Sequence, residues 1–141
     1  METFQDFEEI EAWQMARELM NEIYKASLGG DFAEDAPLRD RIRRTAAAIM
    51  AKIAEGHERG RRREFLQFLA VAKGAIGEVR SHLYVATDQG YLNQEDLERI
   101  SKMAKKTGRE IGTLMNFLRS TEMETPQRRF TDSARKNTPR S

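Results

Sequence analysis

The stretch "AEGHERGRRREFLQFLAVAKGAIGEV", residues 54–79, decides the fold class. Its apolar residues recur at intervals of three and four, which places them on one face of an α-helix. Gly56 and Gly60 bracket a break before this helix, and arginines crowd the break: Arg59, Arg61, Arg62 and Arg63. Because a helix N-terminus carries a partial positive charge that disfavours cations, the cluster needs an explanation from the rest of the chain.

The first of four predicted helices precedes this stretch. We expect Asp6 to be its N-cap, with Glu9 completing a capping box, and Gly29–Gly30 to end it. The segment DFAEDA, residues 31–36, is then a connector.

Three more helices follow the same spacing. The second is expected to begin with Pro37 in its first turn and to run to about Glu55, and the third to run from about Arg62 to Gln89. Asn93 is the predicted N-cap of the fourth helix. Short loops between long helices force neighbours to be antiparallel, so the expected fold is an all-α, up-down four-helix bundle.

Each expected helix carries an apolar stripe for the core. The predicted stripes are Ile10, Trp13, Ala16, Met20, Ile23 and Tyr24; Leu38, Ile42, Ala46, Ile49 and Ile53; Phe65, Leu69, Ala72, Ile76, Val79, Leu83 and Ala86; and Leu97, Ile100, Ala104, Ile111, Leu114 and Leu118.

The chain of 141 residues has the size of one domain, and we expect residues 1–122 to form the bundle. Residues 123–141 have no stripe, contain two prolines and are basic, which predicts a flexible tail unless a partner binds it. The absence of cysteine excludes disulfides and thiolate chemistry. No apolar run reaches the roughly 18–20 residues that span a bilayer, and the acidic N-terminus lacks a signal pattern, so a cytoplasmic protein without a membrane partner is expected.

Charge is segregated along the chain. Residues 1–37 hold ten acidic side chains against two basic ones, whereas residues 39–63 hold nine basic side chains against three acidic ones. This pattern fits a face that binds a polyanion, and it equally fits two neighbouring helices that complement each other.

A second face of small residues marks the two central helices. Away from the core stripes lie Ala47, Met50, Ala51, Ala54, Ala70, Gly74, Gly77 and Ser81. Because glycine inside a helix costs about 1 kcal/mol relative to alanine, these positions predict close approach of another backbone, and we expect a homo-oligomer interface here.

No catalytic constellation is recognisable, so we expect a protein that is not an enzyme, with no cofactor and no metal. Glu78 and His82 stand four residues apart on one helix, but no third ligand accompanies them. What remains is basic charge, in Arg39, Arg43, Arg44, Arg59, Arg61, Arg62 and Arg63. Arginine suits phosphate, so these residues are the predicted nucleic-acid site, reading phosphate position and shape rather than sequence.

Several motifs together carry a family resemblance. "EAWQMARELMNEIY" (11–24), "LRDRIRRTAAAIMAKIAEGHERGRRREFLQFLAVAKGAIGEV" (38–79) and "GYL" (90–92) resemble the 23S rRNA-intervening-sequence proteins, which are similar also to the accessory variability determinant of diversity-generating retroelements. The resemblance implies a closed ring of four-helix bundles, usually a homopentamer, with a basic nucleic-acid surface to which Arg43, Arg44 and Arg59 correspond. In the retroelement branch it implies docking to a reverse transcriptase and its RNA. Lys52 stands where the family commonly has asparagine, and it adds positive charge to the predicted site.

Two functions follow as expectations. The first is a non-catalytic oligomeric adaptor that binds nucleic acid, RNA rather than DNA, and serves as a reverse transcriptase accessory. The alternative is a structural ring in which the charges clamp subunits or a protein partner, with no nucleic acid bound.

Overall fold

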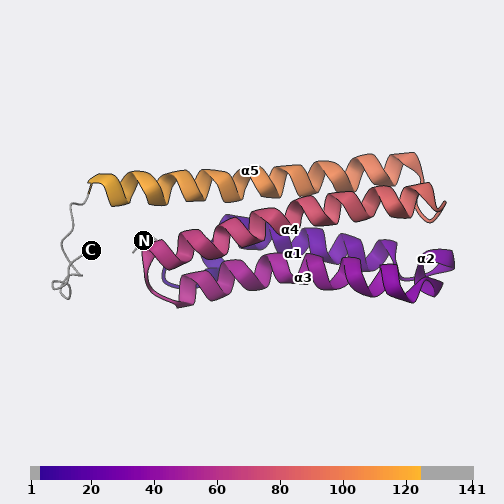
Figure 1. Cartoon of the computed structure of the whole chain (residues 1–141), viewed down its shortest axis with the longest axis horizontal. Helices are drawn as coiled ribbons and strands as arrows, with labels where there is room; N and C mark the ends of the chain where they lie inside the picture. The colour runs from indigo at the N-terminus through magenta and orange to yellow at the C-terminus, as the bar shows by residue number, and fades with distance from the viewer. Residues whose placement is uncertain (1–3, 125–141) are drawn as a thin grey trace.

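The computed structural model describes residues 4–124, and within this range all regular secondary structure is helical (Figure 1). The elements are η1 (Phe7–Glu9), α1 (Glu11–Ala26), α2 (Gly30–Glu34), α3 (Ala36–Glu58), α4 (Arg62–Asp88) and α5 (Gln94–Glu124). None of the helices in these residues combines the length and the hydropathy needed to cross a membrane.

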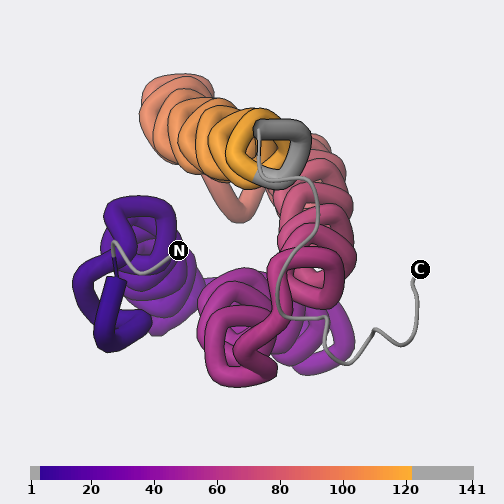
Figure 2. Tube along the Cα trace, turned by 90° about the vertical axis from the view of Figure 1, so that its left-hand side faces the viewer, coloured from indigo at the N-terminus to yellow at the C-terminus, as the bar shows by residue number. Residues whose placement is uncertain are grey.

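The four long helices lie side by side along one axis (Figure 1). In the end-on view of Figure 2 they follow one another around the bundle in the order α1, α3, α4 and α5, and α5 packs against α1 as well as α4. The connection from α3 to α4 lies at one end of the bundle, and the connection from α4 to α5 lies at the other (Figure 1).

Most predicted stripe residues are buried in the core, among them Ile49, Leu83 and Ile111, whereas Trp13, Met20 and Leu38 are only partly buried. The core also contains residues outside the predicted stripes: Ala12, Leu19, Phe32, Leu92 and Met115. Tyr24 was expected in the core but is 41% exposed, because the ring turns outward beneath the guanidinium of Arg43.

The predicted start of the first helix is wrong by one short turn. Asp6 precedes the 3-10 helix η1 and caps nothing with its side chain, and α1 begins only after Ile10. The carboxylate of Glu9 does reach back, but its Oε1 accepts from the backbone N–H of Gln5 at 3.3 Å rather than from Asp6. Burial of Ile10 thus fixes the entry of the chain in place of a capping box.

The predicted connector is partly helical. Helix α1 ends at Ala26, ahead of Gly29, and Gly30 takes a positive φ of 65° to open the five-residue α2. Asp35 then caps α3, its Oδ1 accepting from the N–H of Leu38 at 3.2 Å, with proline in the first turn as predicted.

The later boundaries lie close to their predicted positions. Gly56 was expected at the break but lies inside α3, which continues to Glu58, while Gly60 turns the chain with a φ of 78°. The side chain of Asn93 accepts from the N–H of Asp96 at 2.7 Å and caps α5 as predicted. Helix α5 continues to Glu124, and the rest of the predicted tail, 125–141, lies outside the described residues.

Candidate nucleic-acid interface

The connection between α3 and α4, with the first turn of α4, carries the arginine cluster of the sequence: Arg59, Arg61, Arg62 and Arg63. Arg61 occupies the N-cap position of α4 in extended conformation, and its side chain caps no backbone N–H. Glu64, in the first turn, supplies the negative charge that a helix N-terminus favours. The guanidinium of Arg59 lies 3.5 Å from Glu55 and 3.6 Å from Glu64, while that of Arg61 lies 4.0 Å from Glu64.

An aromatic ring supports the same cluster. The guanidinium of Arg59 lies 5.0 Å from the centroid of Phe68, and the ammonium of Lys52 lies 5.5 Å from it. Lys52 also pairs with Glu55 at 3.4 Å. Phe68 therefore holds two cations at the end of α3 by cation–π attraction.

Positive charge exceeds negative charge at this junction. Five cations (Lys52, Arg59, Arg61, Arg62 and Arg63) stand against three carboxylates (Glu55, Glu58 and Glu64). Within residues 4–121, Arg62 and Arg63 form no ion pair, and the Nε of Arg62 is buried without a hydrogen-bond partner. We call these five cations the junction cluster.

At the opposite end of α3, two of the predicted binding arginines serve the fold. Arg43 donates to both the side chain and the carbonyl of Ser27, and its guanidinium lies 4.6 Å from the centroid of the Tyr24 ring. Arg39 donates from Nη1 to the carbonyl of Ala33 at the end of α2 and from Nε to Asp40 at 2.9 Å.

The third of the predicted binding arginines at this end, Arg44, is exposed. Hydrogen bonding from Arg39 is the main cause that lowers the pKa of the Asp40 carboxyl, and the charges of Arg44 and Arg43 contribute.

The predicted nucleic-acid residues therefore form two groups rather than one patch. Arg39 and Arg59 are 20 residues apart along α3. At 1.5 Å per residue this separation is about 30 Å, the length of most of the helix. Lys52 lies with Arg59, Arg61, Arg62 and Arg63 at the α3–α4 junction, and Arg39, Arg43 and Arg44 lie towards the other end of α3.

The acidic first helix does not neutralise the basic α3 within the chain. Among residues 4–121 no ion pair joins α1 to α3. Glu22 of α1 instead accepts from Arg99 of α5 at 2.6 Å. This hydrogen bond is the main cause that lowers the pKa of the Glu22 carboxyl; partial burial opposes it and the charge of Lys25 assists it.

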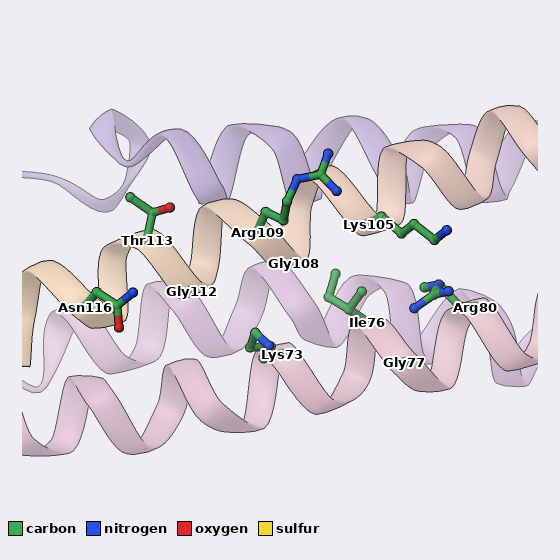
Figure 3. Close-up of a pocket in the computed structure, with 10 residues that line it drawn as sticks. All are labelled: Lys73, Ile76, Gly77, Arg80, Lys105, Gly108, Arg109, Gly112, Thr113 and Asn116. Atoms are coloured by element: carbon green, nitrogen blue, oxygen red, sulfur yellow. The ribbon is translucent and has the colours of Figure 1, made fainter.

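A basic groove between α4 and α5 was missed by the sequence analysis. The groove is open to solvent and has a volume of about 570 Å³, and its lining includes Lys73 and Arg80 of α4, Lys105 and Arg109 of α5, and no acidic residue (Figure 3). A signal was present, since Lys73 and Arg80 are seven residues apart and Lys105 and Arg109 four, spacings that share a helix face. No pattern in the sequence indicates that these two helix faces line the same groove.

The predicted oligomer face lies on the surface of the described chain. Ala51, Ala70, Gly74, Gly77 and Ser81 are exposed, and Ala47, Met50 and Ala54 are half-buried. A Cβ added at Gly74 or Gly77 would meet nothing within 4 Å, so no backbone of the described chain approaches them. Large apolar side chains share this side of α4: Val71, Tyr84 and Val85 are exposed.

The pair Glu78 and His82 is not drawn into a metal site. Glu78 lies 3.8 Å from the guanidinium of Arg41 and accepts from Thr45 Oγ1 at 3.4 Å. Across the described part of the chain, no three histidine, aspartate or glutamate side chains gather in a way that could hold a metal ion.

The chain was compared with known proteins. A search of curated proteins gave no significant match. The sequence profile of the family described as 23S rRNA-intervening sequence protein matches residues 8–113, which include α1 to α4 and the first two thirds of α5. The chain therefore belongs to the 23S rRNA-intervening sequence protein family.

Proposed function

We propose that this protein is a non-catalytic RNA-binding adaptor and that the junction cluster contacts RNA phosphates. The observation that carries the proposal is the excess of cations at the start of α4, where the helix itself disfavours them. Arg61 is 79% exposed and shares Glu64 with Arg59, so its charge is only weakly matched. The family name, which refers to an intervening sequence of 23S rRNA, supports RNA over DNA.

Binding of this kind reads phosphates rather than bases. The two aromatic residues nearest the cluster are not free to stack on bases, since Phe65 is buried in the core and Phe68 is covered by Arg59 and Lys52. Affinity should then depend on RNA shape and on salt, and little on sequence.

The proposal includes an assembly. We take the chain to be an up-down antiparallel bundle that associates through the small-residue face of α3 and α4 into a closed homopentameric ring, as its family resemblance implies. Short connections at alternate ends of the bundle support the antiparallel order. Repeating the junction cluster around a ring would turn modest contacts into avid binding through effective concentration. A reverse transcriptase of a diversity-generating retroelement is the proposed partner, in the cytoplasm.

The test uses Arg61→Gln/Arg63→Gln, because both side chains are exposed and Arg62, with its buried Nε, is left in place. The matched control is Lys102→Gln/Lys106→Gln, two exposed cations of α5 outside the cluster. Binding of a labelled single-stranded RNA is followed by fluorescence anisotropy at several salt concentrations. Loss of two phosphate contacts should reduce the salt slope by about 1.4. Unchanged affinity and slope in the first variant would remove the cluster from the function.

A second function, a ring in which charges clamp subunits without RNA, is favoured by one observation. Within the described residues, the acids of α1 form no ion pair with the arginines of α3 or with Arg61 and Arg63, and a neighbouring subunit could supply the missing partners. In that case the variant Arg61→Gln/Arg63→Gln should dissociate the assembly in the absence of any nucleic acid, as measured by light scattering.

A further inference from the structure

The groove between α4 and α5 has the charge of a phosphate-binding site. Lys73 and Arg80 line one side and Lys105 the other (Figure 3). Arg109 stands at the rim, and it also lines a neighbouring cavity between α1 and α5 that contains Glu11 and Glu18. Within residues 4–121 none of these four cations forms a hydrogen bond or an ion pair.

The groove is distinguished by cations that line it together with no acidic residue. Several cations elsewhere lie beside carboxylates, as Arg99 lies beside Glu22 and Lys52 beside Glu55. In the groove, the like charges of Lys73, Arg80 and Lys105 are gathered among lining residues that include no acid, and such an arrangement raises the local concentration of anions.

Glycines contribute to the floor of the groove. Gly108 and Gly112 of α5 belong to its lining, and so does Gly77 of α4, which is also part of the small-residue face. A Cβ at Gly108 would lie 3.5 Å from Ile76 Cγ2 and one at Gly112 would lie 3.6 Å from Lys73 Cε, both ordinary contact distances. Glycine in a helix interior is less favourable than alanine. Because packing within the described part of the chain requires neither Gly108 nor Gly112, the bare floor fits an occupant from outside.

The groove is aligned with the start of α4. Arg62, Lys73 and Arg80 are 11 and then 7 residues apart, close to three and two helical turns, so they share one side of the helix. From Arg62 to Arg80 the rise along α4 is about 27 Å. Arg62 and Arg80 lie at the two ends of this row of cations. The Nε atom of each is buried and has no hydrogen-bond partner.

We infer that the α4–α5 groove binds consecutive phosphate groups of an RNA backbone that also contacts the junction cluster. This inference rests on the proposed RNA-binding function and extends it by a second site. Arginine donates to phosphate oxygens in a planar fork, lysine adds point charge, and the glycine floor lets the backbone approach closely.

The test compares two triple variants that change the net charge equally. Lys73→Gln/Lys105→Gln/Arg109→Gln removes the exposed groove cations and leaves Arg80, whose Nε is buried. Arg17→Gln/Lys102→Gln/Lys106→Gln removes three exposed cations that are not part of the groove lining. Circular dichroism melting checks that both variants fold.

Binding of a labelled single-stranded RNA is measured against salt concentration. The groove variant should bind at least about tenfold more weakly than the wild type, with a salt slope reduced by about 2, while the control changes much less. Equal losses in the two variants would overturn the groove as a site and leave the proposed function standing. A wild-type chain that binds no RNA at low salt would overturn the proposed function and the groove with it.

A single substitution gives an independent test. Gly112→Glu places a carboxylate on the groove floor, where it would pair with Lys73 and repel phosphate. Ser120→Glu adds the same charge at an exposed position of α5 outside the groove lining. Weaker RNA binding by Gly112→Glu alone supports the groove, and equal binding by the two variants contradicts it.

Discussion

Arg43 of α3 donates two hydrogen bonds to Ser27, the C-cap residue of α1, and so joins the two helices. Its Nε donates to Ser27 Oγ at 2.8 Å and its Nη2 donates to the Ser27 carbonyl at 3.1 Å, while Ser27 itself is fully buried. An arginine that the sequence placed in a nucleic-acid site thus satisfies the backbone at the end of a helix.

Arg43→Ala should therefore lower the free energy of unfolding more clearly than it weakens RNA binding. The substitution leaves a buried carbonyl without one of its donors, and a loss of about 1–3 kcal/mol in the free energy of unfolding is expected. Urea denaturation measures it. Arg44→Ala, at an exposed position one residue on, should change stability by less than about 0.5 kcal/mol. Equal effects of the two substitutions would contradict the structural role of Arg43.

Gly56 is the glycine that packing requires. A Cβ at this position would lie 2.7 Å from Phe68 Cβ, too close for either helix backbone to remain in place. Gly56→Ala should destabilise the protein by about 1–3 kcal/mol in spite of alanine's better helix propensity. Thermal denaturation that shows an equal or higher melting temperature would mean that α3 and α4 do not approach as described.

Gly74 has the opposite character, since nothing in the described chain lies within 4 Å of an added Cβ. If α4 meets another subunit here, Gly74→Leu should leave the fold at least as stable and lower the mass of the assembly in light scattering. Lys102→Leu places the same side chain at an exposed position of α5 and should leave the mass unchanged. An undiminished mass for Gly74→Leu would place the interface elsewhere.

The pair Glu22–Arg99 makes stability depend on pH in a defined direction. The pKa of Glu22 is lowered in the folded chain from an ordinary value of 4.5, mainly by the hydrogen bond from Arg99. The pair therefore stabilises the fold above pH 4.5, and this contribution is lost as the pH falls through the lowered pKa.

Arg99→Gln should return the pKa of Glu22 towards 4.5, which an NMR titration of its carboxyl carbon measures. Because the pair is partly exposed, its loss should cost at most about 1 kcal/mol at neutral pH and nothing in strong acid. A Glu22 pKa that does not move in the variant would assign its shift to another cause.

Sequence periodicity was sufficient for the long helices. Their stripes bury large areas, so residues such as Ile49 and Leu83 identify the inner face, and the cap at Asn93 follows from local chemistry alone. Local sequence patterns did not predict a helix boundary correctly where tertiary packing determines it. Aspartate is a common N-cap residue, which favoured Asp6, but burial of Ile10 places the start of α1 later in the chain.

The candidate site was predicted only in part for a related reason. Four of the five cations of the junction cluster lie within residues 59–63, and Lys52 precedes Arg59 by seven residues, which is about two helical turns, so local spacing is enough to bring them to one end of α3. Whether an arginine side chain is available to bind RNA depends on its neighbours from other helices. The hydrogen bond from Arg43 to Ser27 therefore could not be predicted from the sequence. The groove was missed because Lys73 and Lys105 meet only through the packing of α4 against α5, and each alone is typical of a solvated helix face.

RNA binding by the purified protein is measured by its ratio of nucleic-acid to protein absorbance. It is recorded during size-exclusion chromatography with light scattering, first at low and then at high salt. We expect an oligomer that carries nucleic acid at low salt and releases it as salt rises, since phosphate contacts release counterions on binding. An oligomer that is free of nucleic acid at both salt concentrations would contradict RNA binding and favour the subunit clamp.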